Sequence, residues 1–167
     1  MSIVESTSKD LYANILSKGI KEVVIDADSM VLGRLASIVA KLALMNIRVH
    51  VVNVEKAMLT GDKKRVIEGY KLLFNVRTHR NPYRHAIHRP RNPVTIFKKA
   101  VKNMLPKDNW RGVEALKNVK AYIGVPAKFG GREIVRIIDV SIYSRKAEKY
   151  ITLAELARAL GWHQKVV

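Results

Sequence analysis

The hydrophobic pattern of residues 22–54 changes from the spacing of a strand to that of a helix and back. Residues 22–28 (EVVIDAD) and 48–54 (RVHVVNV) are rich in β-branched side chains, which predicts two buried strands. Between them, apolar residues recur at helical spacing from Leu35 to Met45. Alanines keep the other sides of this helix narrow, so that it can lie close against a sheet. They are Ala36, Ala40 and Ala43. A strand, a helix and a strand in this order form a βαβ unit, which implies a parallel pair.

Helical patterns predominate outside this unit. Residues 1–20 are weakly patterned, with one short helix expected around Leu11–Leu16, and Lys56–Thr60 is expected to continue the sheet edge. Further helices are predicted over Lys63–Phe74 with Asp62 as its cap, Pro93–Met104, Gly112–Lys117, and from a capping box of Thr152 and Glu155 to near Gly161. Further strands are predicted over Val119–Ile123 and Glu133–Val140. The alternation of strands and helices predicts an α/β fold around a small, mainly parallel sheet.

Composition narrows the classes of function. The chain has 167 residues, and 31 Lys and Arg against 14 Asp and Glu give a net charge of +17. A compact chain with this excess repels itself unless a polyanion neutralises it. The absence of cysteine excludes a disulfide framework, a thiolate zinc site and a cysteine nucleophile. Without a signal-peptide pattern or an apolar run long enough for a bilayer, a soluble, cytoplasmic polyanion binder is expected.

The positive charge is concentrated in one part of the chain. Residues 77–111 carry ten basic side chains and one acidic side chain. The loop Arg77–Asn92 is rich in arginine, whose guanidinium group binds phosphate in a bidentate manner, and prolines stiffen it. The helix that follows places its lysines opposite its apolar side. The residues predicted to contact nucleic acid are Lys63, Lys64, Arg77, Arg80, Arg84, His85, His88, Arg89, Arg91, Lys98, Lys99, Lys102, Lys107 and Arg111.

Two other groups of residues could carry chemistry. His79, His85 and His88 lie close together, but no carboxylate or thiol stands nearby to complete a metal shell, which favours contacts with RNA. Asp26 and Asp28 could bind magnesium in a nuclease. Carboxylates just ahead of a helix more simply cap its free N–H groups.

A single glycine in this region, Gly33, does not form a dinucleotide-binding fingerprint, and we expect it to let its helix approach a neighbour closely. Two rival functions remain open at this point. One is an RNA-processing or RNA-modifying enzyme that uses the aspartates or the histidines. The other is a DNA-architectural protein.

Four motifs in order resemble a universal large-subunit ribosomal protein family, the thirteenth in the large-subunit series. They are Asp26–Asp28 with Leu32–Ser37, Val51–Lys56 with Thr60–Gly61, Val101–Pro106, and Leu116–Tyr122 with Gly124. The third, a basic helix that ends in Met-Leu-Pro, is the most distinctive. The chain is similar to the archaeal form, because residues 127–167 continue past the end of bacterial relatives and Gly161-Trp162 resembles an ending shared with eukaryotic members.

The resemblance implies a three-layer α/β/α fold with a basic loop–helix arm and a C-terminal extension. It divides the chain into an N-terminal lead-in (1–21), an rRNA-binding core (22–126) and an extension that ends in a helix (127–167). It implies a non-enzymatic, structural role in the large ribosomal subunit, where the protein binds and stabilises folded rRNA during assembly and translation. The expected partners are large-subunit rRNA and neighbouring ribosomal proteins, with no membrane, small-molecule substrate, cofactor or metal.

Overall fold

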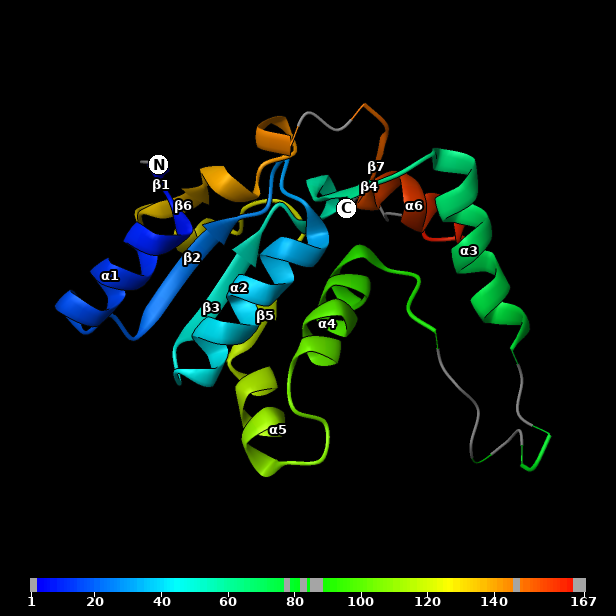
Figure 1. Cartoon of the computed structure of the whole chain (residues 1–167), viewed down its shortest axis with the longest axis horizontal. Helices are drawn as coiled ribbons and strands as arrows, with labels where there is room; N and C mark the ends of the chain where they lie inside the picture. Colours follow the sequence, from blue (N-terminus) through cyan, green and yellow to red (C-terminus); the bar gives the residue numbers. More distant parts are fainter. Residues whose placement is uncertain (1–2, 77–78, 82–83, 85–88, 146–147, 164–167) are drawn as a thin grey trace.

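A parallel sheet forms the centre of the protein. The computed structural model describes residues 3–76, 79–81, 84, 89–145 and 148–163. The five strands of the sheet lie in the order β1 (Ile3–Ser6), β6 (Ile134–Ile137), β2 (Glu22–Asp26), β3 (Arg48–Val52) and β5 (Val119–Ala121). Every neighbouring pair is parallel (Figure 1). The predicted α/β class, its mainly parallel sheet and the βαβ unit are therefore confirmed.

Helices lie on one face of the sheet and beside it (Figure 1). On the face are α1 (Ser8–Lys18), α2 (Leu32–Leu44), α4 (Pro93–Met104) and α5 (Trp110–Lys117). Beside the sheet are α3 (Lys63–Asn75) and α6 (Leu153–Ala159). The side chains of Leu35, Val39 and Leu42 on α2 are completely buried, and the three alanines of this helix are buried too. The alanines thus allow the close packing that the sequence predicts. Within the described part of the chain, no helix is long and apolar enough to cross a membrane.

The opposite face of the sheet has its own apolar cluster. Val24 and Val52 from the sheet pack there with Phe129 and Ile134. Phe129 belongs to one of the four single-turn 3-10 helices in the described part of the chain. These are Val54–Lys56, Ala127–Phe129, Ile138–Val140 and Tyr143–Arg145. The sheet therefore lies between a helical layer and a thinner one, in agreement with the predicted three-layer arrangement.

Segments from near both ends of the chain meet in this sheet. In β1, Ile3 lies opposite Ile134 of β6, while Val135 of β6 lies opposite Ile25 of β2. The sequence pattern did not predict β1, because its short run of mostly exposed residues shows no apolar alternation. The division into a lead-in, a core and an extension stays a prediction. Strands from all three parts nevertheless share one sheet.

The chain leaves the sheet after β3, which corrects the expectation that Lys56–Thr60 continues the sheet edge. Asn53 has a positive φ of 55° and begins a single 3-10 turn, while β5 pairs with β3 on its free side. The residues that follow form β4 (Met58–Thr60), which pairs antiparallel with β7 (Tyr150–Thr152) in a separate two-stranded sheet.

Two expectations about the start of α2 are wrong. Its N-cap is Val31, which makes no side-chain capping hydrogen bond, so Asp26 and Asp28 do not cap it. Gly33 is exposed, and a Cβ atom built on it would meet no atom within 4 Å. Close packing against a neighbour therefore does not explain this glycine.

Candidate nucleic-acid interface

The basic helix α4 is built on a stable start. Asn92 caps it by accepting a hydrogen bond from the Val94 N–H at 3.0 Å, and Pro93 occupies the first turn as predicted. Ile96 and Phe97 on its apolar side are buried in the core next to α2. This packing holds the helix in place and orients its opposite side toward solvent (Figure 1).

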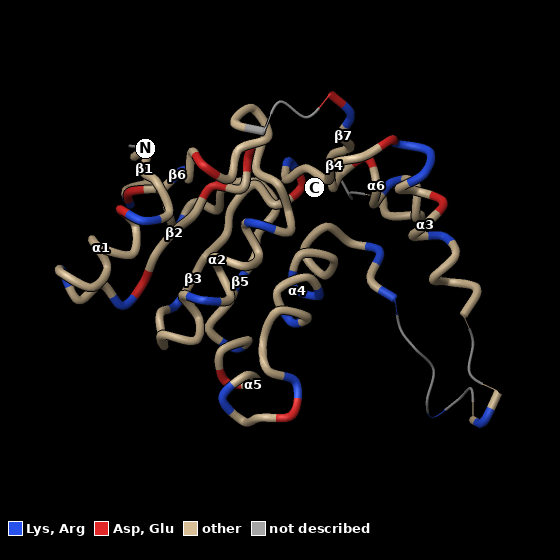
Figure 2. The backbone as a smooth tube through the Cα atoms, in the orientation of Figure 1, with Lys and Arg blue, Asp and Glu red and all other residues tan. Residues whose placement is uncertain are grey.

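A basic groove runs along the outward side of α4. Its cavity has a volume of about 660 Å³, and its lining includes five cationic side chains and no acidic one. The cations are Arg89, Arg91, Lys98, Lys99 and Lys102. Figure 2 places basic residues along α4 and on the chain that leads into it. The structure thus brings together the lysines of the helix and two arginines of the preceding loop, which the sequence predicted as one surface.

The two loop arginines in the groove differ in their contacts with the rest of the protein. Arg91 places its guanidinium carbon 4.7 Å from the ring centre of Phe74 on α3, a cation–π contact. Arg89 has a buried Nε atom without a hydrogen-bond partner among the described residues. The sequence interpretation missed the role of α3 here, although the i, i+4 spacing of Tyr70 and Phe74 could have indicated an aromatic side of that helix.

None of the other predicted contacts that the structure describes lines this groove. Arg80, Arg84, Lys64 and Lys107 are exposed. Lys63 and Arg111 are also exposed, but each has a partner within the protein. The Lys63 Nζ lies 3.2 Å from a carboxylate oxygen of Glu155. The Arg111 Nη2 donates a hydrogen bond to the Leu44 carbonyl at 3.3 Å. Arg77, His85 and His88 lie outside the described residues. These assignments stay predictions.

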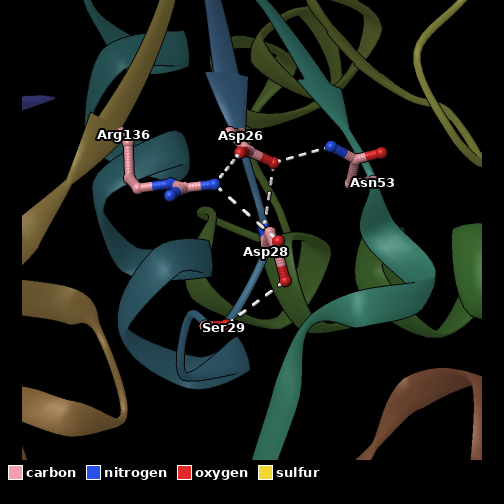
Figure 3. Close-up of polar contacts among 5 residues, drawn as sticks. All are labelled: Asp26, Asp28, Ser29, Asn53 and Arg136. Carbon is pink, nitrogen blue, oxygen red and sulfur yellow. Dashed lines mark hydrogen bonds and ion pairs between the residues drawn. The ribbon is translucent and has the colours of Figure 1, made fainter. Parts of the chain in front are cut away.

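Asp26 at the end of β2 and Asp28 just after it form a charge network (Figure 3). Asp26 is buried, and its Oδ2 accepts a hydrogen bond from Nη2 of Arg136 on β6 at 2.7 Å. Its Oδ1 accepts from the Asn53 amide at 2.9 Å and from the Asp28 N–H at 3.1 Å. The Asp28 carboxylate lies 3.7 Å from the same Arg136 nitrogen and accepts from Ser29.

This network gives the aspartates a role that replaces the predicted helix cap. The hydrogen bond to Asp26 and the neighbouring carboxylates raise the pKa of Arg136, so its charge is permanent. The donors occupy both oxygens of Asp26 and tie β2 to a strand from the far end of the chain. Within the described ranges, no three His, Asp or Glu side chains converge on a possible metal position.

A second charged cluster lies on the same face of the sheet as Asp26, because Glu22 and Asp26 are four positions apart on β2. Glu22 accepts from Nη1 of Arg132 at 2.8 Å and lies 2.9 Å from Nε2 of the buried His50. Burial lowers the pKa of His50 and outweighs the opposing effect of the Glu22 carboxylate. The imidazole is therefore neutral near pH 7, and its contact with Glu22 is a hydrogen bond.

Comparison with known proteins gives consistent matches. The family described as Ribosomal protein L13 matches residues 20–128. The large ribosomal subunit protein uL13 of Sulfolobus acidocaldarius is 49% identical over 139 residues, which cover 83% of this chain and 93% of the relative. The proteins of the same name from Saccharolobus solfataricus and Aeropyrum pernix are 46% and 45% identical, over 84% and 85% of this chain and 93% and 91% of their own lengths.

Proposed function

Since the chain belongs to the ribosomal protein L13 family, we propose that it is a structural component of the large ribosomal subunit. In this role it binds and stabilises folded rRNA during assembly and translation. The observation that carries the proposal is the groove beside α4, whose five cations have no acidic side chain among the lining residues. The named relatives, which are proteins of the large ribosomal subunit, support the choice of ribosomal RNA over other polyanions.

The proposed interface combines the basic side of α4 with the arginine loop. Arginine forks and lysine ammonium groups neutralise phosphates, which supplies most of the affinity. Specificity comes from the shape of folded RNA and from unpaired bases, because the deep major groove of A-form RNA is closed to side chains. The full predicted set of contacts, including Lys64, Arg84 and Lys107, belongs to this proposal.

The proposed role is non-enzymatic and places the protein in the cytoplasm, on the ribosome. Its partners are the large-subunit rRNA and neighbouring large-subunit proteins, without a cofactor. Support against a nuclease comes from the Asp26 carboxylate, whose two oxygens are engaged by protein donors. Metal-dependent cleavage of RNA by the purified protein, lost on replacement of Asp26 and Asp28 by Asn, would contradict this part of the proposal.

Competition binding tests the proposed function directly. The purified chain is bound to folded large-subunit rRNA from Sulfolobus acidocaldarius at moderate salt, and unlabelled rRNA or duplex DNA is added. We expect rRNA to compete at far lower concentration than duplex DNA, since the interface recognises folded RNA. Equal competition by duplex DNA would favour a DNA-architectural protein instead. Crosslinking in cells, followed by identification of the RNA, checks the same point in the native setting.

A further inference from the structure

A second, smaller cleft lies between α3 and α4, next to the basic groove. Tyr70, Leu73 and Phe74 from α3 form one wall, and Ile96 and Ala100 from α4 form part of the other. Its volume is about 210 Å³. This is below the range of about 300–1,000 Å³ that is typical of pockets for drug-sized ligands, so the cleft suits one ring system.

The walls of this cleft combine apolar surface with polar groups that lack partners. Tyr70 and Asn103 both belong to the lining, and among the described residues neither side chain has a hydrogen-bond partner. Burial raises the pKa of Tyr70, so its hydroxyl keeps its proton and can donate. A ligand with aromatic faces and polar edges matches both properties.

Arg89 and Lys99 connect the cleft to the basic groove, because both residues line both cavities. The buried Nε of Arg89 has no hydrogen-bond partner within the described ranges. The junction of the two cavities therefore carries two cations, and the described lining of either cavity contains no carboxylate. An anionic oxygen at this junction would lie against both cations.

We propose that this cleft receives the base of a single unpaired rRNA nucleotide, whose phosphate lies against Arg89 and Lys99. The inference rests on the proposed function and deepens it, because it adds a base-specific contact to a surface otherwise suited to phosphates. A nucleotide fits better than a side chain of a neighbouring protein. It alone joins an aromatic, polar-edged ring to an anionic group, and the lining offers two cations and no carboxylate.

The test uses two neighbouring leucines of α3 as a matched pair. Leu73 lines the cleft, whereas Leu72 is 65% exposed and lies outside it. Leu73→Glu and Leu72→Glu add the same charge at adjacent positions, so their difference reports on the cleft alone. Full-length variants are bound to folded large-subunit rRNA of Sulfolobus acidocaldarius, and the reactivity of each unpaired base is probed chemically in the complex.

We expect the Leu73 variant to bind at least about fivefold more weakly than the Leu72 variant, in keeping with the strength of base stacking on protein side chains. The parent and the Leu72 variant should protect one unpaired base that the Leu73 variant leaves reactive. Equal affinity and equal protection in the two variants would overturn the inference and leave the proposed function standing. Failure of the parent to bind rRNA would overturn the proposed function itself.

Tyr70→Phe supplies a variant that keeps the ring and its packing. The loss of one hydrogen bond to the base should weaken binding by about 2- to 12-fold and raise the reactivity of the same base, with an unchanged melting temperature. This variant decides the matter if Leu73→Glu fails to fold in a thermal melt. Unchanged affinity and unchanged protection with Tyr70→Phe would then count against the inference, and a protein segment would become the favoured occupant.

Discussion

Charged side chains near the central sheet are paired with opposite charges, whereas the cations that line the groove on the α3–α4 side lack acidic neighbours. Residues 1–28 carry five acidic and three basic side chains, whereas residues 62–117 carry fifteen basic and four acidic ones. Near the sheet, Arg136 pairs with Asp26, and Arg132 pairs with Glu22. Along α4, the cations of the groove have no acidic neighbour in the lining.

The presence of an opposite charge separates side chains that stabilise the fold from side chains that are available to bind an anion. A compensated pair such as Asp26–Arg136 joins two strands and leaves little net field outside the protein. Uncompensated cations at one surface repel one another, and the binding of a polyanion relieves this repulsion. Charge content alone therefore does not identify an interface in this protein. Under the proposed function, the interface is distinguished by the absence of acidic partners beside its cations.

Salt should produce the largest contrast between the two regions. With roughly six to ten phosphate contacts, affinity for folded rRNA should fall about 10³- to 10⁵-fold between 50 and 200 mM salt. The melting temperature of the free protein should change little, because partly buried pairs such as Asp26–Arg136 are screened much less. Filter binding and thermal melts over the same salt series measure both. A flat binding curve would contradict the phosphate-based interface.

Removal of loop arginines should have the next largest effect. Replacement of Arg84, Arg89 and Arg91 by Ala should weaken rRNA binding by about two orders of magnitude or more, since hydrogen bonds to charged groups contribute about 1.5–3 kcal/mol each. The free energy of unfolding should fall only by the contribution of the exposed Arg91–Phe74 cation–π contact, which is about 0.5–1 kcal/mol. Binding assays and thermal melts on the same samples separate the two effects.

Two control variants sharpen this result. Replacement of the same arginines by Lys keeps the charge and removes the planar fork, so its affinity should lie between parent and Ala variant. Replacement of the exposed Lys9, Lys18 and Lys21 by Ala removes equal charge from the α1 side and should matter little near 0.15 M salt, where the Debye length is about 8 Å. Equal losses from the two Ala triples would show that only net charge counts.

Removal of Arg136 should affect stability and spare binding. Arg136→Met leaves the buried Asp26 carboxylate without its cation, which costs about 1–3 kcal/mol because the arginine side chain is 35% exposed. The melting temperature should fall by about 2–12 °C. The matched Arg132→Met change, at a side chain that is 52% exposed, should cost less than about 1 kcal/mol. An equal loss in both variants would contradict a special role for the Asp26 pair.

The smallest effect is expected at the ion pair between α3 and α6. Lys63 is a predicted RNA contact, yet its ammonium group lies beside Glu155. Exposed pairs of this kind are worth about 0.2–1 kcal/mol, so Glu155→Gln should release Lys63 and raise rRNA affinity by less than about fivefold. Titrations of parent and variant at one salt concentration measure the change. A lower affinity for the variant would place Lys63 outside the interface.

Much of the local structure followed from short-range signals. Asp62 caps α3 by accepting a hydrogen bond from the Arg65 N–H, and Thr152 caps α6 in the same way through Glu155. The apolar spacing of α2 correctly predicted its burial. The basic side of α4 was predicted for the same reason, since helical periodicity assigns each residue to a side over three or four positions.

The sequence by itself thus determined most of the elements, though not β1 or β7, together with the amphipathic sides of the helices and the concentration of positive charge. Only the tertiary structure decided which charges are compensated. Asp26 and Arg136 are 110 positions apart, and Lys63 and Glu155 are 92 apart, so no local pattern indicates either pair. The tertiary arrangement of distant segments also places β6 between β1 and β2. It likewise brings Arg91 into contact with Phe74. Hydrogen bonds and charge pairs act over a few ångströms in space, and the topology of the chain alone brings such distant residues within that range.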